Sequence, residues 1–137
     1  MRRTFRIEKE IELHVGEEWF DLKNIYFFSG LDLDATSGKV RLIFEGHPES
    51  GRPELIGKKV AVCFYQISHF EVSRLFVPKV NTELLRIGFK SPSDYDTDWL
   101  LNDEQSEEVD HLLFCLGNDE FVRIYANRVE LEKLSIY

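Results

Sequence analysis

Three aspartates at alternate positions form the pattern in this sequence that comes closest to a known chemical motif. Asp94, Asp96 and Asp98 are spaced like the first ligands of a calcium-binding loop, in which carboxylate oxygens coordinate the ion. The rest of that loop is missing, because Trp99 stands where the loop needs Gly and Gln105 where it needs a bidentate Glu. We therefore predict no metal site here and interpret the segment as an acidic loop.

Residues of the common catalytic and metal-binding motifs are scattered along the chain. The four histidines are far apart, and none stands at zinc-ligand spacing from another His or a Cys. The sequence has no glycine-rich phosphate loop and no glycine-flanked nucleophilic serine. Cys63 and Cys115 each lie in an apolar stretch, which predicts buried, reduced thiols. We predict a protein that is not an enzyme and needs no cofactor.

Negative charge is concentrated in the last third of the sequence. The 137 residues include 17 Lys and Arg and 25 Asp and Glu, which gives a net charge of −8. Residues 1–90 are nearly neutral, whereas residues 91–137 contain 12 acidic and 3 basic side chains. Nucleic acids and anionic membranes are bound by basic surfaces. We therefore expect neither of them as a partner.

The acidic segment surrounds a small apolar group, and two interpretations of it remain open. It can be a solvated loop that favours solubility and is attached to the core by Trp99, Leu100 and Leu101. It can instead be a docking surface for a basic protein, with carboxylates that steer the encounter and Trp99 as the anchor. The residues predicted to make this contact are Asp94, Asp96, Asp98, Trp99, Glu104, Glu107, Glu108 and Asp110.

Alternation of apolar and polar residues with a period of two dominates the chain and predicts strands. The clearest pair is a hairpin around Gly117-Asn118-Asp119. Residues 98–110 have no sustained apolar face, so they form either a turn or two of helix or a loop. The predicted strands are residues 5–15, 19–29, 40–45, 60–65, 70–75, 84–90, 111–116, 120–125 and 127–134.

Length and composition predict one all-β domain over residues 1–137. The chain is 43% apolar and 13% aromatic, which provides a core and argues against disorder. About eight short strands with polar turns predict an antiparallel β-sandwich or a small, partly open barrel with little helix. Charged residues interrupt the N-terminal region, and no apolar run is long enough to span a bilayer. We therefore expect a cytoplasmic protein, of unknown oligomeric state.

These features together resemble the small bacterial immunity proteins of toxin–immunity systems. The resemblance rests on the chain length, the strand-rich pattern, the acidic segment 94–110 and the final hairpin, in which Leu112-Leu113-Phe114-Cys115-Leu116 precedes Phe121-Val122-Arg123-Ile124-Tyr125. Immunity proteins are typically acidic, cytosolic, single-domain chains that bind and block a cognate toxin. The resemblance implies occlusion of the active site, or of a nearby exosite, of a toxin with a basic surface. A nuclease is the natural candidate, because its substrate groove is basic.

A small-ligand-binding β-barrel is the alternative function. It is suggested by aromatic residues that can line an apolar cavity or fill an ordinary core. These residues are Trp19, Phe20, Tyr26, Phe27, Phe28, Phe64 and Tyr65. An enclosed cavity would favour the ligand barrel, and a filled interior with an exposed acidic ridge would favour the protein-binding function. A hydrolase or lyase would need titratable groups that converge in one cleft.

Overall fold

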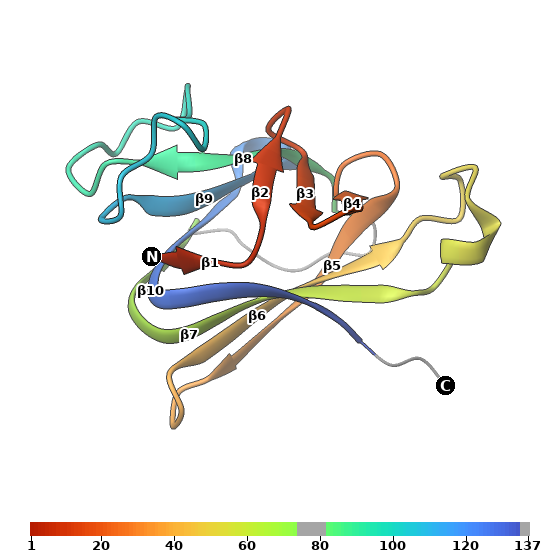
Figure 1. The fold of residues 1–137 in the computed structure, drawn as a ribbon, viewed down its shortest axis with the longest axis horizontal. Coiled ribbons are helices and arrows are strands. Elements are labelled where there is room, and N and C mark those ends of the chain that lie inside the picture. Colours follow the sequence, from red (N-terminus) through yellow and green to blue (C-terminus); the bar gives the residue numbers. More distant parts are fainter. Residues whose placement is uncertain (74–81, 135–137) are drawn as a thin grey trace.

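A computed structural model of the protein describes residues 1–73 and 82–134 and has an all-β fold (Figure 1). Two single-turn 3-10 helices, η1 (Pro53–Leu55) and η2 (Gly117–Asp119), are the helical segments of this part of the chain. No helix in these two ranges is long and apolar enough to cross a membrane. The described strands are β1 (Arg2–Arg3), β2 (Arg6–Glu8), β3 (Glu12–Val15), β4 (Glu18–Asp21), β5 (Tyr26–Asp34), β6 (Lys39–Gly46), β7 (Lys59–Val72), β8 (Leu84–Lys90), β9 (His111–Leu116) and β10 (Phe121–Lys133).

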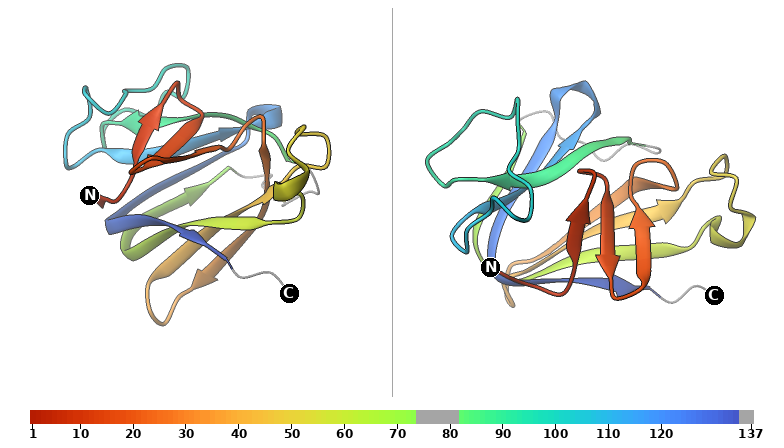
Figure 2. Two further views of the ribbon diagram at one scale, coloured as in Figure 1. Left: turned by 45° about the vertical axis from the view of Figure 1, so that its right-hand side comes forward. Right: turned by 45° about the horizontal axis from the view of Figure 1, so that its top comes forward.

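A strongly curled antiparallel sheet forms most of the molecule (Figure 2). Its strand order is β5-β6-β7-β10-β9-β8, and β1 adds a short parallel pair to β10. The sheet curls until its edges approach each other, where Phe28 of β5 pairs with Thr82 just before β8. A second sheet, β2-β3-β4, lies across the open side. The predicted antiparallel, partly open architecture is therefore confirmed, as a half-barrel with a small covering sheet.

An irregularity shared by β7 and β10 helps the sheet to curl. Gln66 of β7 has a positive φ of 56°, and the register against β10 shifts between Tyr125 and Ala126. A β-bulge of this kind bends the strand and increases its twist. The predicted strands 60–65 and 70–75 belong to one bent strand, β7, and the predicted strands 120–125 and 127–134 belong to one bent strand, β10. The last two residues of the predicted strand 70–75 lie outside the described residues.

Two of the predicted strands contain a turn and are wrong as single elements. Residues 5–15 fold back as β2 and β3, because Lys9 and Glu10 adopt positive φ angles of 54° and 60°. Residues 19–29 divide into β4 and β5, since the Asp21 carboxylate accepts hydrogen bonds from the backbone N–H groups of Lys23 and Asn24. After this turn, β5 continues to Asp34, beyond the end of the predicted strand 19–29.

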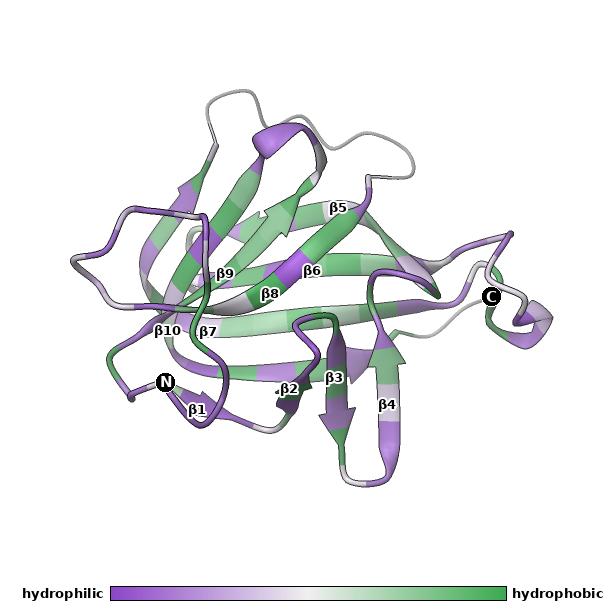
Figure 3. Ribbon diagram, turned by 90° about the horizontal axis from the view of Figure 1, so that it is seen from above, coloured by the Kyte–Doolittle hydropathy of each residue, from purple (hydrophilic) through white to green (hydrophobic). Residues whose placement is uncertain are grey.

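Large apolar side chains fill the concave face of the half-barrel. Alternate residues of β6 are buried, as the period of two predicts. The rings of Phe28, Phe44, Phe114 and Phe64 form a continuous row, with successive centroids 5.5, 6.4 and 6.2 Å apart. Leu13 of β3 belongs to the same core, so the small sheet packs against the large one. In Figure 3, the hydrophobic strands lie inside a periphery of hydrophilic loops.

The close approach of η1 to the end of β6 generates a prediction about Gly46. A Cβ atom at this position would lie 1.8 Å from the backbone carbonyl oxygen of Leu55. We expect Gly46→Ala to lower the free energy of unfolding by at least about 2 kcal/mol, because the backbone must move to make room. Gly30→Ala is the matched control, since nothing lies within 4 Å of a Cβ there. Urea denaturation measures both variants, and equal stabilities would contradict the prediction.

Candidate functional site

The eight residues predicted to contact a partner belong to one loop, residues 91–110, between β8 and β9 (Figure 1). Of the two possibilities for residues 98–110, the structure shows the loop, which contains turns and no helix. Leu101 exchanges backbone hydrogen bonds with Phe89 of β8. Leu100 is buried against Leu113 and Cys115 of β9. These two β9 residues alternate with core residues, so the loop packs on the outer face of the sheet.

Two cations buried in the sheet hold the loop. Lys90 has no exposed surface, and its Nζ atom lies 3.3 Å from Oδ2 of Asp94 and 3.9 Å from the centre of the Trp99 ring. Arg123, which is 2% exposed, donates hydrogen bonds to the backbone carbonyls of Asp94 at 2.6 Å and Ser91 at 2.8 Å. A buried charge needs such partners, because its removal from water is costly. The sheet therefore fixes the path of the loop backbone.

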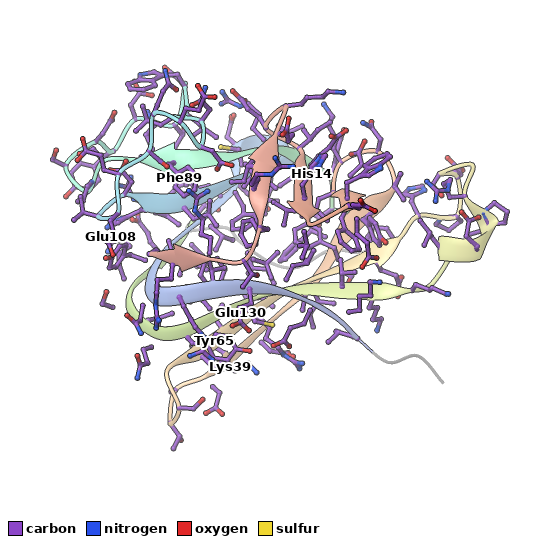
Figure 4. All side chains as sticks on the ribbon, in the orientation of Figure 1. His14, Lys39, Tyr65, Phe89, Glu108 and Glu130 are labelled. Carbon is purple, nitrogen blue, oxygen red and sulfur yellow. The ribbon has the colours of Figure 1, made fainter. Side chains whose placement is uncertain are left out.

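Several carboxylates of the loop remain free, because the arginines beneath it bond to backbone carbonyls. Arg86 also follows this pattern, with bonds to the carbonyls of residues 97 and 98 at 2.8 and 2.9 Å. Two aromatic residues of the same loop, Tyr95 and Trp99, are 77% and 51% exposed. Within residues 1–73 and 82–134, no hydrogen bond or ion pair engages the carboxylates of Asp98, Glu104, Glu107 and Glu108 (Glu108 is labelled in Figure 4).

The other predicted aspartates bond inside the loop. Asp94 accepts a hydrogen bond from the backbone N–H of Asp96 at 2.9 Å, and Asp96 accepts one from the N–H of Asp98 at 2.7 Å. The Asp96 N–H and the Lys90 ammonium lower the pKa of Asp94 below its usual value. Asp110 is buried and accepts the backbone N–H of residue 107 at 2.7 Å. The calcium-like spacing thus serves turns, since Asp94 and Asp96 each accept the backbone N–H two residues ahead.

The residues that position the loop were not predicted from the sequence. Lys90 and Arg123 were not selected, although a charged residue within an apolar strand such as β10 was an available signal. Asp103 is a second omission, since its carboxylate pairs with Arg3 and accepts the backbone N–H of Ile7 at 2.8 Å. The loop is thereby tied to the N-terminal strands as well. No group of three or more His, Cys, Asp or Glu side chains suited to a metal ion occurs in the described ranges.

A neutral histidine completes the network under the loop. His111 is 8% exposed, and its Nδ1 atom accepts a hydrogen bond from Nε of Arg123 at 2.9 Å. A guanidinium can only donate, so Nδ1 carries no proton and the ring is neutral. Burial, together with the positive charge of Arg123 and the nearby His69, lowers the pKa of His111 to about 4. The two histidine rings have centroids 4.5 Å apart.

A second polar cluster lies on the outer face of β6, β7 and β10, and Figure 4 shows two of its members, Lys39 and Tyr65, on the side away from the small sheet. The Tyr65 hydroxyl donates a hydrogen bond to Glu132, and Arg128 and Lys39 lie 4.1 and 4.9 Å from the ring centre. Burial and the Glu132 carboxylate raise the pKa of Cys63 to about 12. This thiol is therefore not an activated nucleophile. Both cysteines are buried and free, as predicted.

Comparison with protein-family models, curated proteins and solved structures finds no match to this chain. The functional inference therefore depends on the loop itself. Its backbone is fixed by cations from below, and part of its carboxylates face outward.

The low pKa of His111 predicts a loss of stability in mild acid. In the unfolded chain this histidine takes up a proton near pH 6.5, whereas the folded protein resists protonation down to about pH 4. The stability should therefore fall as the pH decreases through this window, by up to about 3 kcal/mol from this group. We expect His111→Asn, whose side-chain oxygen can still accept from Arg123, to flatten that dependence.

The measurement is urea denaturation of both proteins at several pH values between 7 and 4. His14→Asn, which removes a histidine from the small sheet, is the control for the loss of any histidine. Parallel pH profiles for the wild-type protein and His111→Asn would contradict the assignment.

Proposed function

We propose that the protein is a non-enzymatic binding protein of the bacterial cytoplasm, which neutralises a cognate protein toxin through the 91–110 loop. One observation carries this proposal. Four loop carboxylates make no hydrogen bond or ion pair with the described residues and accompany two exposed aromatic rings, while the loop backbone is fixed by buried cations. This is the composition expected of a docking surface for a basic partner.

The fixed backbone supports binding rather than only solubility. A loop that is already ordered loses little conformational entropy when a partner binds, so more of the contact energy remains as affinity. The Trp99 ring is oriented by its contact with Lys90, 3.9 Å away, and is still half-exposed. A half-exposed ring of this kind is suited to be the anchor of an interface. The carboxylates around it would steer the encounter.

A nuclease is the toxin class that this surface suits best. Residues 91–137 contain 12 acidic and 3 basic side chains, so the field of this part of the chain is strongly negative. A nuclease binds the phosphates of its substrate in a groove lined by Lys and Arg. An ordered row of carboxylates can occupy such a groove and block it.

The filled interior supports a protein partner over a ligand held inside the barrel. Phe28 and Phe64, which suggested a cavity, are at most 1% exposed and form part of the phenylalanine row. Tyr65 lies on the outer face of the sheet. Three others of that set, Trp19, Phe20 and Tyr26, line a pocket at the end of the half-barrel. The described residues do not enclose a cavity lined by all of these rings.

The proposal predicts that charge reversal on the loop slows association with the toxin. The variant Asp98→Lys/Glu104→Lys/Glu107→Lys changes three carboxylates that make no bond within the described residues, so the loop should keep its conformation. We expect association about 10-fold slower at low salt, with a flatter salt dependence, because the steering field is lost. Stopped-flow fluorescence with the product of the adjacent gene, in an inactivated form, measures this rate.

A control triple variant separates position from net charge. Glu17→Lys/Glu49→Lys/Glu83→Lys changes three exposed acids outside the loop and alters the net charge by the same amount. We expect a rate within about 2-fold of the wild-type protein. If both variants slow association equally, or if the adjacent gene product does not bind at all, the proposal fails.

A further inference from the structure

A pocket of about 540 Å³ lies at the end of the half-barrel away from the acidic loop. It is bounded by β4, the start of β5, the η1 segment and the neighbouring ends of β7 and β10. In Figure 1, η1 and the end of β10 lie on the right, whereas the 91–110 loop lies on the left. The volume falls within the range of small-molecule sites.

Tyr26 presents an unpartnered polar group to this pocket. Its side chain lines the pocket and is only 4% exposed. No residue in ranges 1–73 and 82–134 forms a hydrogen bond with its hydroxyl. Burial raises the pKa of Tyr26, and the positive charge of Arg52 on the pocket wall acts in the opposite direction. No buried polar side-chain atom of the described residues lacks a hydrogen-bond partner, so this hydroxyl reaches the pocket surface, where it can donate to a bound molecule.

The pocket wall combines an aromatic ring with an excess of basic side chains. Trp19 is 48% exposed and stacks on His14, which fixes the orientation of its ring. Arg52 uses only its Nε atom, in an exposed pair with Glu54, and Lys58 makes no ion pair within the described part of the chain. Four basic and two acidic side chains line the pocket, although the whole chain has a net charge of −8.

Ion pairs engage three of the four basic side chains, which leaves the Nη groups of Arg52 and the ammonium of Lys58 open to a ligand. Arg52 pairs with Glu54 through Nε, and the Lys59 ammonium lies 3.9 Å from Glu45. Glu18 is paired with Lys133, 2.5 Å away, so Glu17 is the acidic wall residue without an ion pair among the described residues. The phenol of Tyr26, the free Nη groups of Arg52 and the ammonium of Lys58 are all hydrogen-bond donors. Donors of this kind hold a carboxylate with charge-assisted hydrogen bonds.

We propose that this pocket binds a small aromatic carboxylate. The aromatic ring packs on Trp19, and the carboxylate accepts hydrogen bonds from Tyr26, Arg52 and Lys58. This site goes beyond the toxin-binding function and does not depend on it, because the acidic loop contributes no residue to the pocket.

The test compares 2-naphthoate with two analogues of similar shape: 2-naphthamide, which is uncharged, and 2-naphthylmethylamine, which is a cation. The chain has only two tryptophans, so the indole N–H signals in a nitrogen–proton correlation spectrum distinguish the pocket (Trp19) from the acidic loop (Trp99). We expect 2-naphthoate to shift the Trp19 signal with a dissociation constant of about 1 mM or below. The two analogues should bind at least about 10-fold more weakly.

Two variants test the donors separately. Tyr26→Phe removes a hydroxyl that makes no bond in the described residues, and Lys58→Gln changes an exposed side chain, so both should fold. Each should weaken 2-naphthoate binding by about 5- to 10-fold. Tyr95→Phe, in the acidic loop, is the matched control and should have no effect. Equal binding of the three probes, a shift at Trp99 alone, or unchanged affinity in Tyr26→Phe would each overturn the proposal.

Discussion

Two positive charges buried in an apolar sheet determine where the acidic loop lies. Lys90 and Arg123 have almost no contact with water, and their partners come largely from the loop. Without it, both charges would be uncompensated at the sheet surface, which costs several kcal/mol. Folding of the loop is therefore coupled to folding of the sheet. His111 belongs to the same constraint, because it can accept from Arg123 only while it is neutral.

The same interaction explains how a segment so rich in like charges can be ordered. Its carboxylates repel one another, and repulsion alone would favour an extended chain. The arginines of the sheet counter this through the loop backbone, since Arg123 and Arg86 bond to four backbone carbonyls of residues 91–98. Order is thus obtained without using the outward-facing acids. The surface keeps its charge and loses its flexibility, which are the two properties that a docking surface requires.

The sequence predicted the strands well and their turns less well, for physical reasons. Alternation records which side chains are buried, so the all-β class and most strand positions follow from local pattern. The reversal at Lys9 and Glu10 and the bulge next to Gln66, between Ile67 and His69, use positive φ angles without glycine. Lys9 interrupts the alternation of apolar and polar residues, but such a break does not distinguish a bulge from a full reversal of the chain. The acidic loop was found from composition. Which of its carboxylates are bonded did not follow from composition, because this depends on contacts between distant residues, such as Arg3 with Asp103, which are 100 positions apart.

The packed core separates the acidic loop from the pocket beside Trp19, the two surfaces for which we propose binding functions. The row of phenylalanine rings and the side chains around it fill the concave face of the sheet. Packed interiors of this kind resist small displacements. The packed core therefore isolates the loop around Trp99 from a molecule in the pocket beside Trp19. The loop backbone is bonded to the sheet, and the pocket is bounded by the opposite strand ends. Each surface can therefore act through its own chemistry. The loop offers negative charge, and the pocket offers hydrogen-bond donors.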